Sequence, residues 1–181
     1  MTTPYINIRH LTKKFAQHSV LNQLNLTINA GEIQVMSAGL GIMHSEFNHS
    51  ATEPVTLFQI WLFPNKRDVK PRYDQIAYDK EKMHNEWVQI ISPDPNDAGS
   101  WIHQDAWFHL GNFDKGQNVQ YQMKKEGNGL YAFILKGSFV IDEQEMDLRD
   151  GLGITGTNQI DIIARENDAE ILLMEVPMNL H

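Results

Sequence analysis

The chain has 181 residues, a formal net charge of −8, 41% hydrophobic residues and no cysteine. Its length fits one ordinary domain or two small ones, and the missing cysteine excludes disulfides, thiolate metal ligands and cysteine nucleophiles. The acidic excess disfavours nucleic-acid binding, and no apolar run approaches the ~20 residues that span a membrane. With no secretory signal pattern at its start, we expect a cytoplasmic protein without nucleic-acid or membrane partners.

Strand patterns dominate the first half of the chain. β-branched and aromatic residues are enriched in short runs that turn residues bring to an end. We expect strands over Leu24–Ile28, Val55–Phe63 and Trp87–Ile91. Short helices are expected at Arg9–Gln17 and Tyr73–Met83.

The second half is a regular series of short strands separated by Gly, Asn and Asp. The predicted strands are Asp105–Leu110, Asn118–Met123, Leu130–Leu135, Ser138–Ile141, Gly153–Thr155, Gln159–Ala164 and Ala169–Glu175. Many short strands with frequent turns are typical of a barrel or jelly roll. The turn-rich segment Ser92–Ser100 precedes this series and is the expected domain boundary.

One motif carries metal-binding chemistry. His44 and Glu46 stand two positions apart, after the glycine-rich segment Gly39–Gly41. Residues i and i+2 of a strand point to the same face, so an imidazole nitrogen and a carboxylate oxygen can reach one metal ion. Non-haem iron sites use at least two histidines and one carboxylate, and His10 and His18 are the candidates to complete this one. Three further histidines, His84, His109 and His181, are expected at the surface or in structural positions.

The motif also carries a family resemblance. Residues 32–46, followed by the Gln-x-Trp strand at Phe58–Leu62, resemble the pirin family. Segments of the second half are similar to the second domain of quercetinase-like pirins, namely Ile102–Ala106, Leu135–Ser138 and Ala169–Leu173. The resemblance runs from Gly31 to the C-terminus. It implies an all-β fold of two tandem cupins, which are small jelly-roll barrels, with the first cupin truncated and few short helices.

The expected domain organisation follows from this resemblance. We expect a leader over residues 1–32, a truncated first cupin over 33–92, a linker over 93–100 and a second cupin over 101–181.

The resemblance implies a metal site in the first cupin. Family members hold one metal ion, usually iron, through three histidines and a glutamate, and two of those histidines come from a Pro-His-x-His segment that this chain lacks. His44 and Glu46 match the other two ligands. Glu46 would also act as the base that takes a proton from a flavonol substrate. The predicted site is therefore incomplete. We expect it to bind either a divalent metal ion, with iron as the first candidate, or no metal at all.

The leader resembles a different family. Residues 6–15 and 20–32 are similar to the opening of an ABC transporter ATPase, which continues into a Gly-x-x-x-x-Gly-Lys-Ser/Thr phosphate loop. No lysine follows the glycines here, so Gly39–Gly41 is predicted to be a turn. We expect Tyr5–Ile8 and Val20–Ile28 to pair with the truncated first cupin and cover it.

Two functions remain open at this point. One is a metal-dependent quercetin 2,3-dioxygenase-type oxidoreductase of weak or lost activity, acting on a flavonol-like small molecule. The alternative is a non-enzymatic pirin-type regulator that binds a protein partner. A nucleotide-binding remnant of an ABC ATPase is disfavoured by the missing lysine.

Overall fold

The computed structural model describes residues 6–15, 18–28, 31–39, 47–48, 50–54 and 56–179, with residues 6–15, residues 18–28 and Phe47 described as backbone only. The chain divides into two compact units, Met1–Ala77 and Tyr78–His181. Strands make up both units, and in these described ranges the helical structure is a single 3-10 turn, η1 (Glu81–Met83). No helix of the described ranges is long and apolar enough to cross a membrane.

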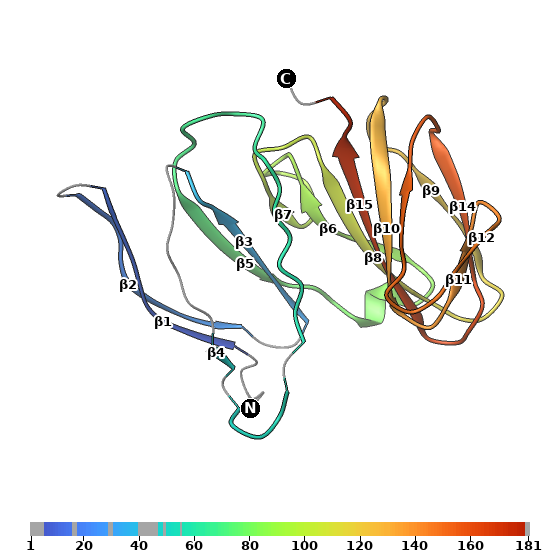
Figure 1. The fold of residues 1–181 in the computed structure, drawn as a ribbon, viewed down its shortest axis with the longest axis horizontal. Coiled ribbons are helices and arrows are strands. Elements are labelled where there is room, and N and C mark those ends of the chain that lie inside the picture. Colours follow the sequence, from blue (N-terminus) through green and yellow to red (C-terminus); the bar gives the residue numbers. More distant parts are fainter. Residues whose placement is uncertain are drawn as a thin grey trace. The chain divides into compact units, whose positions relative to one another are not determined.

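The first unit contains two small antiparallel sheets (Figure 1). One has the strand order β2-β1-β4 and the other pairs β3 with β5. The strands are β1 (Ile6–Phe15), β2 (His18–Ile28), β3 (Glu32–Ser37), β4 (Phe47–Asn48) and β5 (Arg72–Ala77). The expected pairing of the leader is confirmed in part, because the first residues of β1 pair with β4 while β2 pairs with β1.

The second unit is a sandwich of two sheets (Figure 1). The six-stranded sheet has the order β13-β10-β15-β8-β6-β7, and the four-stranded sheet has the order β12-β11-β14-β9. The strands are β6 (Trp87–Ser92), β7 (Ser100–Trp101), β8 (Trp107–Phe113), β9 (Asn118–Gln122), β10 (Asn128–Lys136), β11 (Phe139–Ile141), β12 (Gln144–Met146), β13 (Gly151–Ile154), β14 (Gln159–Ala164) and β15 (Ala169–Pro177).

Alternating apolar residues place the core between these two sheets. In β14 every second residue is buried, at Ile160, Ile162 and Ala164, which is the period of a strand with one solvated face. The inner residues of β15, including Ile171 and Leu173, are 0% exposed and belong to the same core cluster. The predicted all-β cupin fold is thus confirmed, and the strands expected in the second half all lie within or across observed ones.

Both predicted helices are wrong. The residues expected to form the first, Arg9–Gln17, lie largely in β1, where pairing with β2 outweighs a weak helical pattern. The second, Tyr73–Met83, is replaced by β5 and η1, because β5 pairs along its whole length with β3.

Two further expectations differ from the structure. Residues 56–63, predicted as a strand with Val55, have no strand assigned, and among the described strands none pairs with them. The expected linker over 93–100 does not coincide with the division between Ala77 and Tyr78. The reason is that β6, which precedes this segment, pairs with β8 and belongs to the six-stranded sheet of the second unit.

Candidate functional site

The two predicted metal ligands, His44 and Glu46, lie outside the described residues, in the connection between β3 and β4. The described start of this connection is a turn at Gly39, where φ is +56° and an added Cβ would lie 2.6 Å from the carbonyl oxygen of Val69. Glycine alone fits a position that is both left-handed and this crowded. The expected turn is therefore confirmed at Gly39, five residues before the first candidate ligand.

The two candidate recruits lie on one hairpin. His10 is in β1, beside an irregular stretch of its pairing, and His18 begins β2 opposite Phe15. At about 3.3 Å per residue, the backbones of His10 and His18 are roughly 16 Å apart along the hairpin. Whether either histidine joins His44 and Glu46 stays a prediction, because the side chains of both lie outside the described part of the chain.

A chain of hydrogen bonds crosses the small sheet formed by β3 and β5. Gln75 donates from Nε2 to a carboxylate oxygen of Glu32 at 2.6 Å, and Gln34 donates from Nε2 to the hydroxyl of Tyr73 at 3.0 Å. That hydroxyl in turn donates to the side-chain oxygen of Gln75. Side chains from both strands are thus fixed by one another. The sheet that leads into the His44–Glu46 segment therefore has a polar, ordered face.

The second unit holds a buried carboxylate that the sequence motifs did not indicate. Glu175 is 0% exposed on the inner side of β15. Its Oε2 accepts from the hydroxyl of Tyr121 at 3.0 Å and from the backbone N–H of Lys124 at 2.8 Å. Its Oε1 accepts from the backbone N–H of Lys125 at 2.9 Å and from Nδ2 of Asn128 at 2.8 Å.

These hydrogen bonds give Glu175 a structural role. A carboxylate offers about four lone-pair sites, and a buried one is tolerated when hydrogen bonds occupy them. Glu175 has no free site for a metal ion. The signal that could have found it is its place in the series Ile171, Leu173, Glu175, where a charge continues an apolar inward face.

His109 completes this buried cluster. Its Nδ1 lies 3.3 Å from the hydroxyl of Tyr121, and its side chain is 4% exposed. Burial is the main reason why the pKa of His109 falls from 6.5 to about 4. Burial, and then the neighbouring Glu175, raise the pKa of Tyr121. At neutral pH both rings are uncharged, so His109 occupies a structural position, as expected.

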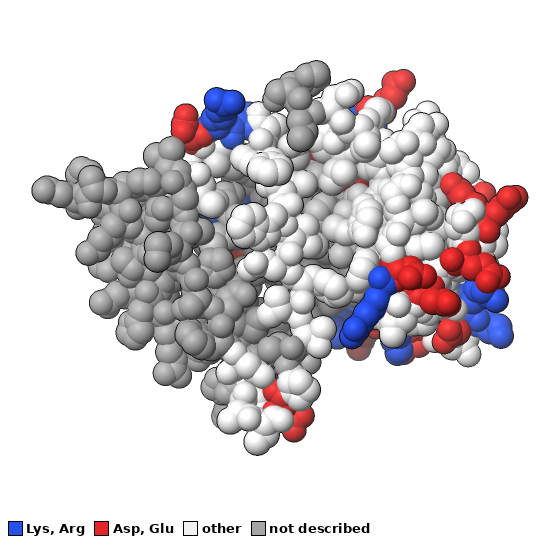
Figure 2. Space-filling view, in the orientation of Figure 1, with Lys and Arg blue, Asp and Glu red and all other residues white. Residues whose placement is uncertain are grey.

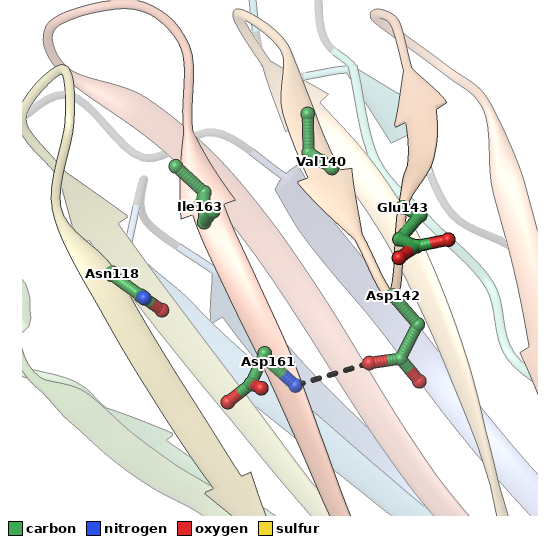
Figure 3. Close-up of a pocket in the computed structure, with 6 residues that line it drawn as sticks. All are labelled: Asn118, Val140, Asp142, Glu143, Asp161 and Ile163. Carbon is green, nitrogen blue, oxygen red and sulfur yellow. Dashed lines mark hydrogen bonds between the residues drawn. The ribbon is translucent and has the colours of Figure 1, made fainter.

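A hollow on the outer face of the four-stranded sheet is a second place where carboxylates gather (Figure 3). Its lining residues are Asn118, Val140, Asp142, Glu143, Asp161 and Ile163. The backbone N–H of Asp161 donates to Oδ1 of Asp142 at 3.3 Å, and Gln120 donates to Oδ1 of Asp161 at 2.7 Å. Within the described ranges, no three or more His, Asp or Glu residues are grouped to hold a metal ion. The hollow therefore does not replace the predicted site.

The surface charges of the second unit are mixed. On the face drawn in Figure 2, acidic and basic side chains are interspersed. Ion pairs account for part of this mixing, as between Arg165 and Glu145, whose charged atoms are 3.0 Å apart. Exposed pairs of this kind contribute little to stability.

Comparison with known families gives two matches. The family described as the quercetinase C-terminal cupin domain matches residues 74–176, which is more than half of the chain, and the family described as pirin matches residues 11–62. The second match begins well before Gly31 and takes in most of the expected leader. None of the comparisons supports the resemblance of the leader to an ABC transporter ATPase.

Individual curated proteins of the same family are also similar to this chain. Quercetin 2,3-dioxygenase from Escherichia coli (strain K12) is 35% identical over 150 residues, which are 83% of this chain and 63% of the relative. A pirin-like protein from Caulobacter vibrioides is 33% identical over 149 residues, which are 81% of this chain and 62% of the relative. The chain thus spans 63% or less of the length of these two relatives.

Solved structures agree with these matches. YhhW from Escherichia coli superposes with a TM-score of 0.80 at 29% identity, covering 99% of this chain and 75% of that chain. Bacterial pirin YhhW in complex with nickel(II), also from Escherichia coli, gives a TM-score of 0.77 at 28% identity, covering 97% of this chain and 74% of that chain. Matching domains, relatives and fold together make this chain a member of the pirin family.

Proposed function

We propose that this chain is a pirin-type bicupin of the quercetin 2,3-dioxygenase kind, which binds a divalent metal ion through His44 and Glu46 and oxidises a flavonol-like substrate weakly. The observation that supports this most strongly is the 35% identity to a quercetin 2,3-dioxygenase across 83% of the chain. The His44-Ser45-Glu46 motif, which carries the resemblance to the pirin family, adds the donor atoms that such chemistry needs.

The donor set suits a transition metal. Imidazole nitrogen and carboxylate oxygen are common ligands of iron and nickel, and one relative is described in complex with nickel(II). His10 or His18, but not both, is proposed as the third ligand, since their backbones are roughly 16 Å apart. A site with three protein ligands would retain open positions for substrate, whereas two ligands alone would hold the ion weakly.

The chain's own residues would bind the ion and move a proton. The ion, when bound, would make the flavonol hydroxyl more acidic and the deprotonated ring more reactive toward dioxygen. His44 would hold the ion as a neutral imidazole. Glu46, two residues along the chain, would accept the hydroxyl proton as a general base. The turn at Gly39 and the ordered sheet of β3 and β5 would fix the start of the segment that carries both groups.

The test is flavonol-dependent oxygen uptake by the full chain after loading with iron(II) or nickel(II). We expect uptake by the wild type, a loss of about 100-fold or more in Glu46→Gln if it is the base, and a comparable loss in His44→Ala. The matched control is His84→Ala, because His84 is exposed and lies in the second unit. Equal uptake by the wild type and His44→Ala would remove His44 from the mechanism.

A second candidate is a non-enzymatic pirin-type protein that binds a partner protein. The shortage of metal ligands favours it, because this chain lacks the Pro-His-x-His segment that supplies two of the histidine ligands in family members. It predicts a folded protein that retains less than stoichiometric metal and has no flavonol-dependent oxygen uptake. Nucleotide binding is not proposed, since residues 11–62 match the pirin family.

A further inference from the structure

The second unit buries a chemically labile pair of residues, Asn128-Gly129, at the start of β10. The sequence contains one Asn-Gly pair, and this is it. Asparagine followed by glycine loses its side-chain amide readily, because glycine has no Cβ to hinder its backbone nitrogen and leaves the chain flexible. In the unfolded chain, Asn128 is therefore the asparagine expected to deamidate first.

The folded unit holds this amide in place. Asn128 is 5% exposed and lies on the same side of β10 as the core residue Leu130. Its Nδ2 donates to Oε1 of Glu175 at 2.8 Å and to the backbone carbonyl of Asp105 at 3.3 Å. An asparagine amide has two hydrogens, so both are engaged. The backbone of Asn128 and Gly129 is also held, because both residues pair with β15.

Deamidation requires movements that these contacts prevent. The backbone nitrogen of Gly129 gives its proton to water and attacks Cγ of Asn128. The bond between Cγ and Nδ2 then breaks and ammonia leaves with the proton it needs. Water opens the resulting cyclic imide to aspartate or isoaspartate. The side chain must therefore leave Glu175, and water must enter a site that is 5% exposed.

We propose that Asn128 is a site of spontaneous deamidation that reacts only while the second unit is open, and whose product prevents the unit from closing again. The reactants are the chain itself and water. The proposal is independent of the metal site and of the proposed activity, because every residue that carries it belongs to the second unit.

The product does not fit the closed unit. An aspartate would set a second carboxylate against Oε1 of Glu175, where Asn128 now supplies a hydrogen. Glu175 is 0% exposed, and two adjacent buried carboxylates cannot both be ionised. Isoaspartate instead adds a methylene to the backbone of β10 and shifts its register against β15. Deamidation thus turns a reversible opening into a permanent loss of the folded unit.

Incubation of the full chain at mildly alkaline pH tests the proposal. Mass spectrometry of the peptide that contains Asn128 measures the converted fraction. We expect conversion in buffer to be at least about 100-fold slower than in concentrated urea, because only the open population reacts. The matched control is Glu126→Gln, which is exposed in the connection before β10 and should convert as the wild type does in both solvents.

Two destabilised variants show whether opening controls the reaction. Glu175→Gln removes a contact of Asn128, whereas Gly111→Ala crowds the ring of Phe113 elsewhere in the same unit. Both should convert faster in buffer in proportion to their loss of stability, by roughly 100-fold in Glu175→Gln. Both should match the wild type in urea. If Glu175→Gln does not fold, it should convert in buffer at the urea rate, and Gly111→Ala remains the test.

The chemistry and the fate of the product have their own readouts. Gly129→Ala should convert more slowly than the wild type in urea, because the added Cβ hinders the attacking nitrogen. Deamidated chain returned to buffer should lack hydrogen-exchange protection in β9 and β15. Equal conversion in buffer and urea, rates that do not follow stability, or full recovery of this protection by the deamidated chain would overturn the proposal.

Discussion

Replacing Glu175 by Gln is predicted to destabilise the second unit strongly, although the two side chains have nearly the same shape. Each carboxylate oxygen accepts one backbone N–H, from Lys124 at 2.8 Å and from Lys125 at 2.9 Å. A glutamine can keep only one of these acceptors. Whichever oxygen becomes the amide nitrogen, one backbone N–H loses its partner and faces another donor.

The magnitude follows from burial. Glu175 is 0% exposed, so no water can replace the lost acceptor, and an unsatisfied buried donor costs about 1–3 kcal/mol. The remaining hydrogen bonds also lose the strengthening that a charged acceptor provides. We expect a total loss of about 3 kcal/mol in the free energy of unfolding of the second unit, which corresponds to ~100-fold faster exchange through global opening.

Hydrogen exchange of peptides from β9 and β15 in mild urea measures this loss in the second unit alone. The matched control is Glu126→Gln, because Glu126 is exposed in the connection between β9 and β10, and its exchange should match the wild type. If Glu175→Gln were within about 0.5 kcal/mol of the wild type, the carboxylate would not be the acceptor of all four hydrogen bonds, and the reasoning would be refuted.

Three other predictions concern both units. His109 has a pKa near 6.5 in the unfolded chain and near 4 in the folded chain. About 3 kcal/mol of the free energy of unfolding that is present above pH 6.5 is therefore lost as the pH falls to 4. In urea titrations, His109→Gln should lose less stability than the wild type over this pH range. Gly111→Ala should lower the free energy of unfolding by about 1–3 kcal/mol through overpacking, because its Cβ would lie 2.4 Å from the ring of Phe113. Gly153→Ala is the control, because its Cβ would have no neighbour within 4 Å, and it should melt close to the wild type. His10→Ala or His18→Ala, but not both, should lower metal affinity in a competition titration.

Strand content could be predicted wherever burial follows the period of a strand. The pattern of β14 in the sequence matches its buried and exposed residues at every position except Ile163, which is apolar yet 37% exposed, and its predicted bounds are those observed. Strand β11 was predicted, but β12, which forms a hairpin with it, was missed because the turn between them is Asp142-Glu143, both with positive φ (43° and 69°). Such two-residue turns are normally recognised by Asn-Gly or Asp-Gly, and this one lacks the glycine.

Local patterns failed where long-range pairing decides the structure. The residues of β1 and β5 carry helical spacing and charge, but pairing with β2 and β3 makes them strands. Conversely, residues 56–63 have strong strand propensity and no strand assigned. Propensity describes a segment alone, whereas a strand requires a partner.

The candidate metal site stays a prediction, because His44 and Glu46 lie outside the described residues. Their spacing predicts a pair of metal ligands, and the family matches agree with the resemblance that the motif carries. Glu175 and His109 could not be recognised in the same way, because hydrogen bonds from Lys124, Lys125 and the hydroxyl of Tyr121 decide what they do. Hydrogen bonds donated by backbone N–H groups cannot be recognised from the identities of the side chains.

Metal content tests the central claim most directly. The purified full chain is loaded with iron(II) or nickel(II), dialysed, and its bound metal is measured by mass spectrometry. The account predicts about one ion per chain in the wild type, little in His44→Ala and in Glu46→Gln, and an unchanged content in His84→Ala. Equal metal in the wild type and in both site variants, or no retained metal in any of them, would contradict it.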